Sequence, residues 1–104
     1  MDITNTQVED TSIVKIEGDL LIGCVAQAKP KIVAALAAGD KVLLDLGNLG
    51  ECDTAGIQLL LMARASARSQ SKSLFVTANS TSFLTTLERV GIPADVFEYR
   101  NAGG

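Results

Sequence analysis

The residues best placed to do chemistry in this sequence are an adjacent acid and hydroxyl, Asp53 and Thr54, followed by Ala55 and Gly56. They precede a helical pattern, and Asp and Thr are both good N-caps because their oxygens accept hydrogen bonds from first-turn amides. Asp53 also complements the positive end of the helix dipole. Ala55 and Gly56 are small, so other groups can approach the first turn of the helix closely. Capping alone explains why Asp and Thr occur at these positions. The sequence therefore leaves two interpretations open: a helix cap with no further role, or a binding surface.

Histidine is absent, which removes the commonest general base, the commonest metal ligand and every imidazole-based triad. No group of Cys, Asp and Glu has the spacing of a metal site. The sequence also lacks a glycine-rich phosphate loop and a nucleophile–base pair. It therefore predicts a protein that is not an enzyme and that uses no cofactor and no metal.

The totals predict one globular domain over residues 1–104, because the length suits a single domain and 47% of residues are hydrophobic. Nine basic residues are scattered along a chain of net charge −3, so nucleic acid is not expected as a partner. The polar N-terminus does not resemble a secretion signal, and apolar runs are too short to span a bilayer. We expect a cytoplasmic protein that does not insert into membranes, with Cys24 and Cys52 as free thiols.

The first half of the chain predicts strands at residues 3–8 and 12–17, joined by a hairpin turn at Glu9 and Asp10. An amphipathic helical pattern covers residues 25–38, and Gly39 follows as its stop. Pro30 should kink or restart this helix, so its regular part is expected to begin near Lys29. A buried strand at residues 41–46 then leads into a loop at residues 47–50.

The second half predicts a helix over residues 54–69, apolar almost all round in its early part, and a strand at residues 73–77. Ser80 is the expected N-cap of a third helix, and Gly91 and Pro93 stop it. Its expected apolar stripe consists of Phe83, Leu84, Leu87 and Val90. A short last strand at residues 96–99 and a frayed end at residues 101–104 complete the prediction. The order β-β-α-β-α-β-α indicates an α/β fold, a mixed sheet with three to four helices packed on it.

Four segments resemble the STAS domain family of sulfate-transporter cytosolic domains and anti-sigma-factor antagonists. Residues 53–57 and the leucines after them resemble the family's Asp-Ser/Thr-x-Gly-Leu signature. Residues 17–20 resemble its Gly-Glu-Leu turn, residues 42–46 its central strand, and residues 83–92 its last helix and the following turn. The resemblance covers essentially the whole chain and implies the STAS fold.

The resemblance also implies a partner switch, in which a serine/threonine kinase phosphorylates the hydroxyl residue after the Asp and so releases the partner. Thr54 matches that acceptor. The expected partner is an anti-sigma factor with serine kinase activity or a chemotaxis kinase. The expected partner-binding residues are Asp19 and the run Asp53, Thr54, Ala55, Gly56 and Ile57.

One position departs from the family pattern, because Leu21 stands where many phosphorylated antagonists carry an Asp. This departure leaves two other branches open. One consists of stand-alone STAS proteins linked to chemotaxis, which residues 20–22 and 53–60 resemble most, acting as adaptors without phosphorylation. The other is the STAS subunit of a lipid-transport ABC system, docking on its ATPase.

Overall fold

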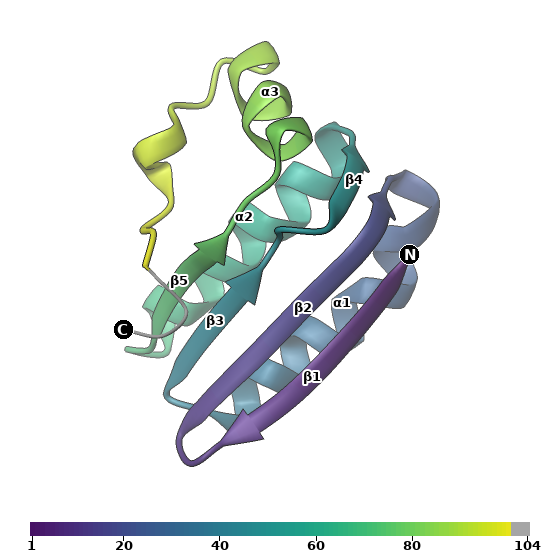
Figure 1. The fold of residues 1–104 in the computed structure, drawn as a ribbon. Helices are drawn as coiled ribbons and strands as arrows, with labels where there is room; N and C mark the ends of the chain where they lie inside the picture. Colours follow the sequence, from purple (N-terminus) through teal and green to yellow (C-terminus); the bar gives the residue numbers. More distant parts are fainter. Residues whose placement is uncertain (101–104) are drawn as a thin grey trace.

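The computed structural model describes residues 1–100, and a five-stranded mixed sheet lies at its centre (Figure 1). The strands are β1 (Asp2–Val8), β2 (Thr11–Leu20), β3 (Lys41–Asp45), β4 (Leu49–Cys52) and β5 (Ser73–Ala78). β1 and β2 form an antiparallel hairpin, and β3 and β5 follow as parallel neighbours in the order β1-β2-β3-β5. β4 pairs in parallel with the last residues of β2, past the end of β3.

Two long helices, α1 (Ile22–Ala38) and α2 (Thr54–Ser69), lie side by side on one face of the sheet (Figure 1). The shorter α3 (Thr81–Arg89) packs beside β4 at the end of the sheet, and a 3-10 turn, Ala94–Val96, follows it. This arrangement brings the start of α1, the start of α2 and β4 to the same end of the molecule. Every residue predicted to do chemistry lies at that end.

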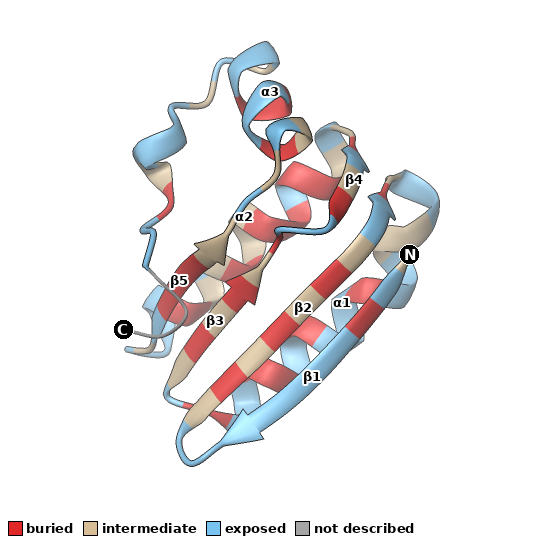
Figure 2. Cartoon of the chain, in the orientation of Figure 1, coloured by how far each residue is buried: buried red, intermediate tan, exposed pale blue. Residues whose placement is uncertain are grey.

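The core lies between the sheet and the two long helices, as the buried stripes in Figure 2 show. Alternation along β2 places Val14 and Ile16 against the helices, with neither side chain exposed. From α2, Ile57 and Leu60 belong to the same core and are also fully buried. Because the early turns of α2 are anchored in this core, the loop before it is held in a fixed position.

Most of the predicted elements are confirmed, including the first hairpin, α2 and the end of α1 before Gly39. Ser80 caps α3 by accepting a hydrogen bond from the Phe83 amide at 3.3 Å. Gly91 follows α3 with a φ of 78°, the left-handed conformation that glycine adopts without strain. Local capping signals therefore located these helix ends correctly.

The predicted start of the first helix near Lys29 is wrong, because α1 begins at Ile22 and continues through Pro30. Proline removes one backbone hydrogen bond, that to the carbonyl of Ala26. Both Pro30 and Ala26 are exposed, so water can satisfy the carbonyl and the helix need not break there.

The predicted loop at residues 47–50 and the predicted strand at residues 96–99 are also wrong in part. β4 begins at Leu49, because β2 extends beyond β3 and offers its free end for pairing. Near the C-terminus, a 3-10 turn and a single bridge between Val76 and Tyr99 replace the strand. Leu84 lies outside the apolar stripe of α3 and is exposed, and Thr86 is buried instead. The predicted frayed end lies outside the described residues.

Candidate functional site

The carboxylate of Asp53 joins the first turns of the two long helices. Its Oδ1 accepts a hydrogen bond from the Gly56 amide at 2.9 Å, which makes Asp53 the N-cap of α2. Its Oδ2 accepts from the Ile22 amide, also at 2.9 Å, at the start of α1. One side chain therefore satisfies free amides of two helices that are far apart in sequence.

These hydrogen bonds favour the ionised carboxylate. The Gly56 amide, with smaller contributions from the Ile22 and Ala55 amides, holds the pKa of Asp53 below its ordinary value despite an opposing effect of burial. At neutral pH the loop before α2 therefore carries a fixed negative charge.

Gly56 allows α2 to approach the end of β2 closely. A Cβ at this position would lie 2.5 Å from the Leu20 carbonyl oxygen and 2.8 Å from the Cys52 sulfur. Neither distance is compatible with a side chain, and Gly56 is itself buried. The glycine of the signature thus has a packing role in this chain, and the position of the loop depends on it.

The predicted site residues 53–57 differ in exposure, although the structure brings them together in one turn. Thr54 is exposed in the first turn of α2, and Asp53 and Ala55 are half-buried beside it. Gly56 is buried and the side chain of Ile57 is fully buried in the core. The surface that another molecule can reach therefore consists of Asp53, Thr54 and Ala55. We call these three residues, the N-cap of α2 and its first two helical residues, the switch loop.

Asp19, the remaining predicted site residue, lies on β2 next to β4. Its Oδ1 accepts a hydrogen bond from the Glu51 amide at 2.8 Å. Gly50 passes so close to this carboxylate that a side chain at residue 50 would displace the Asp19 carboxylate. Asp19 is exposed and holds β4 against β2, so it supports the strand that leads into the switch loop.

An apolar groove begins beside the switch loop and runs between α1 and α2. It has a volume of about 420 Å³ and is lined by Ile22, Val25, Ala26, Lys29, Ala55, Gln58, Leu59 and Met62. Ile22 is 74% exposed, the most exposed large apolar side chain among the described residues. Sequence reasoning missed this groove; the apolar run at residues 20–22 was the available signal for it.

A polar cleft of about 420 Å³ lies on the other side of the switch loop, between β4 and α3. Its lining combines hydroxyl groups with charged and apolar side chains from Leu21, Glu51, Cys52, Asp53, Thr81, Ser82, Thr85, Thr86 and Arg89. Thr86 of α3 donates a hydrogen bond to the Cys52 carbonyl of β4 at 2.8 Å, which holds the two sides of the cleft together. Leu21 lines the cleft together with Asp53.

The two cysteines are free thiols, and Cys52 is buried beneath the switch loop. Burial, and secondly the charge of Asp53, raises the pKa of Cys52 to about 11. Within residues 1–100, no three Cys, Asp or Glu side chains cluster as a metal site would require. No helix of the described residues is long and apolar enough to cross a membrane.

Comparison with known proteins gives one family match. The family model described as "Mlab, STAS domain" matches residues 3–96. No curated protein matches the sequence.

Several solved structures share the fold. An anti-sigma-factor antagonist described as putative, from Thermotoga maritima, has a TM-score of 0.81 at 16% identity, covering 97% of this chain and 88% of its own. The anti-sigma-factor antagonist SpoIIAA in its unphosphorylated form has a TM-score of 0.79 at 16% identity, covering 98% and 90%. A variant of RsbS from Moorella thermoacetica has a TM-score of 0.78 at 19% identity, covering 97% and 87%.

Proposed function

Because this chain belongs to the STAS domain family, we propose that it is a non-enzymatic regulatory module that binds a protein partner through the switch loop and the adjoining apolar groove. The observation that carries the proposal is the exposed hydroxyl of Thr54, in the first turn of a helix whose cap is already occupied by Asp53. Since Asp53 serves as the cap, the Thr54 hydroxyl is free for another role.

The groove supplies the apolar part of the proposed interface. Interfaces usually combine an apolar centre with a polar rim. Ile22 and Met62 lie along the groove, and Lys29 provides a positive charge at its side. A partner helix with an apolar face and an acidic residue opposite Lys29 would match this surface.

Phosphorylation of Thr54 would change the surface without unfolding the domain. A phosphate adds about −1.5 to −2 charge. The helix N-terminus tolerates an anion, because the dipole and the free amides of the first turn favour it. In a closed interface the same phosphate would lie beside the ionised Asp53, where repulsion and desolvation oppose binding. A loss of about 3 kcal/mol would weaken the complex roughly 150-fold.

The proposed partner is a serine kinase of the anti-sigma-factor type or a chemotaxis kinase. Purified protein would be incubated with ATP and each candidate serine kinase or chemotaxis kinase from the same genome, and the phosphorylated residues would be mapped by mass spectrometry. We expect phosphate on Thr54, and we expect Thr54→Asp to bind the kinase at least about 10-fold more weakly than wild type. Thr4→Asp, a matched change on the exposed face of β1, should bind normally. Absence of phosphate on Thr54 together with normal binding by Thr54→Asp would refute the switch.

A second candidate function is a permanently docked subunit of a lipid-transport ABC system, with Thr54 as a contact residue. The observation that favours it is the apolar side chain of Leu21 in the cleft beside Asp53, where many phosphorylated members carry an acid. Co-purification with the ATPase subunit, lost on Ile22→Asp and kept on Thr54→Ser, would support docking. A deletion strain with unchanged lipid transport would count against it.

A further inference from the structure

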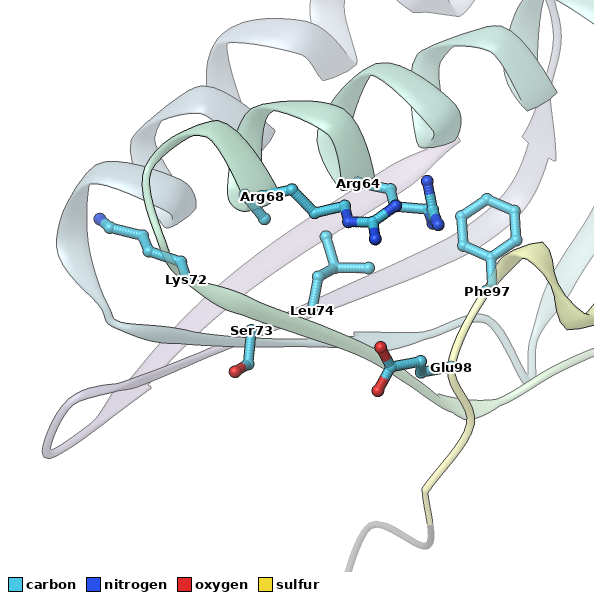
Figure 3. Close-up of a pocket in the computed structure, with 8 residues that line it drawn as sticks. Arg64, Arg68, Lys72, Ser73, Leu74, Phe97 and Glu98 are labelled. Carbon is cyan, nitrogen blue, oxygen red and sulfur yellow. The ribbon is translucent and has the colours of Figure 1, made fainter.

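A separate cavity lies near the opposite end of α2 from the switch loop (Figure 3). It has a volume of about 310 Å³ and is bounded by the last turns of α2, the start of β5 and the segment after the 3-10 turn. Arg64 is ten residues after Thr54, which corresponds to about 15 Å along the helix. The cavity also shares no lining residue with the switch loop or the apolar groove, so it is distinct from the proposed partner surface.

Two guanidinium groups line one wall of this cavity. Arg64 and Arg68 are one helical turn apart on the same face of α2, and Figure 3 shows the guanidinium group of Arg68 over Leu74 and that of Arg64 between Leu74 and Phe97. Like charges at this spacing repel each other, and an anion between them would remove the repulsion. Planar guanidinium groups bind phosphate oxygens through paired hydrogen bonds, so the wall suits an oxyanion.

Lys72 adds positive charge near the cavity but is held elsewhere. Its ammonium group donates a hydrogen bond to the Leu36 carbonyl near the end of α1, and Figure 3 shows it pointing away from the two arginines. The contact with a ligand would therefore come from Arg64 and Arg68.

The rest of the cavity lining indicates which other chemical groups a ligand would have. Ala67, Leu74 and Phe97 form an apolar floor and are each buried. Exposed Glu98 and Ser73 lie on the other side of the cavity. A carboxylate opposes an anion placed close to it and accepts hydrogen bonds from hydroxyl groups. The matching ligand has its anionic group at the arginines and a small, partly apolar body over the floor.

We propose that this cavity binds a small phosphate monoester, with Arg64 and Arg68 on the phosphate and the ester body over Leu74 and Phe97. The dianion matches the two guanidinium charges, which a carboxylate or a sulfate ester does not. The proposal does not depend on the function of the switch loop.

The test is a titration of the full chain with phenyl phosphate at neutral pH, followed by two-dimensional NMR of backbone amides and arginine side chains. We expect shifts at Arg64, Arg68 and Leu74, and binding at least about 5-fold weaker for phenyl sulfate, which has the same shape and one charge fewer. Arg64→Gln and Arg68→Gln should each weaken binding at least about 10-fold. Glu98→Gln should tighten it, because the opposing charge is removed.

Arg89→Gln, a matched change at an arginine outside the cavity, should bind phenyl phosphate as wild type does. Equal weakening by Arg89→Gln would show nonspecific attraction and overturn the proposal. The absence of shifts at about 10 mM ligand, a concentration about tenfold above the Kd of a millimolar site, would also overturn the proposal. Sedimentation with vesicles containing phosphatidic acid distinguishes the source of the phosphate. Arg64-dependent sedimentation would identify a lipid headgroup, and its absence with phenyl phosphate binding intact would identify a soluble ester.

Discussion

The carboxylate of Asp53 accepts a hydrogen bond from the backbone amide of Ile22, 31 residues earlier in the chain, at 2.9 Å. Because the same carboxylate caps α2, the relative position of the two helices at this end depends on one side chain. The apolar groove between α1 and α2 begins at this link. Asp53 therefore shapes the proposed partner surface as well as contributing charge to it.

Asp53→Ala should lower the free energy of unfolding by about 2 kcal/mol, since it removes an N-cap and leaves the Ile22 amide without its acceptor. Asp53→Asn retains one acceptor oxygen and should lose less. Urea denaturation of the three proteins, followed by circular dichroism, measures the differences. If the alanine variant were as stable as wild type, the two hydrogen bonds would contribute nothing to the fold.

The lowered pKa of Asp53 gives a pH dependence of defined sign. A carboxyl group with a folded-state pKa below its ordinary value of 3.8 stabilises the fold above that pH. This contribution is lost as the pH falls through the folded-state pKa. Wild type should therefore be more stable than Asp53→Asn at neutral pH, and the difference should shrink below about pH 4. A difference that stayed constant between neutral and acidic pH would show that the charge of Asp53 is not involved.

Gly56→Ala should destabilise the protein by at least about 2 kcal/mol, because the new methyl group would collide with the Leu20 carbonyl and the Cys52 sulfur. Gly23→Ala is the matched control: it lies in α1, and a Cβ there would meet no atom within 4 Å. This control should stabilise the protein by up to about 1 kcal/mol, as alanine favours a helix over glycine. Thermal unfolding of both variants measures the contrast, and equal effects would refute the close approach.

The start of α2 could be predicted from the sequence because its cap is local. Asp53 and Gly56 are three residues apart, and Thr54 is next to Asp53. The start of α1 could not be predicted, because Leu21 provides no side-chain cap and the amide of Ile22 is satisfied by a residue far along the chain. Capping signals thus identify a helix end only when donor and acceptor are close in sequence.

The surfaces around the switch loop depend on contacts that no local pattern records. β4 forms because the long strand β2 offers its end to a four-residue segment that includes Gly50. The burial of Ile57, which the sequence placed in the partner surface, follows from how α2 lies on the sheet. Likewise, Arg64 and Arg68 are visible as a pair in the sequence, but the rest of their cavity comes from β5 and the C-terminal segment.

The thiol of Cys52 should react slowly with iodoacetamide in the folded protein. Burial, with a smaller effect from the charge of Asp53, raises its pKa from 9.0 to about 11, so at pH 8 its thiolate fraction is about 100-fold lower than for an ordinary thiol. Because the folded state keeps the thiol proton, this group stabilises the fold below about pH 9 and stops doing so as the pH rises through 11. Alkylation at each cysteine can be timed by mass spectrometry, with the same protein in urea as the control. Cys24, which is only half-buried, should be modified first. Equal rates for Cys52 in the folded and unfolded protein would contradict its burial beneath the switch loop.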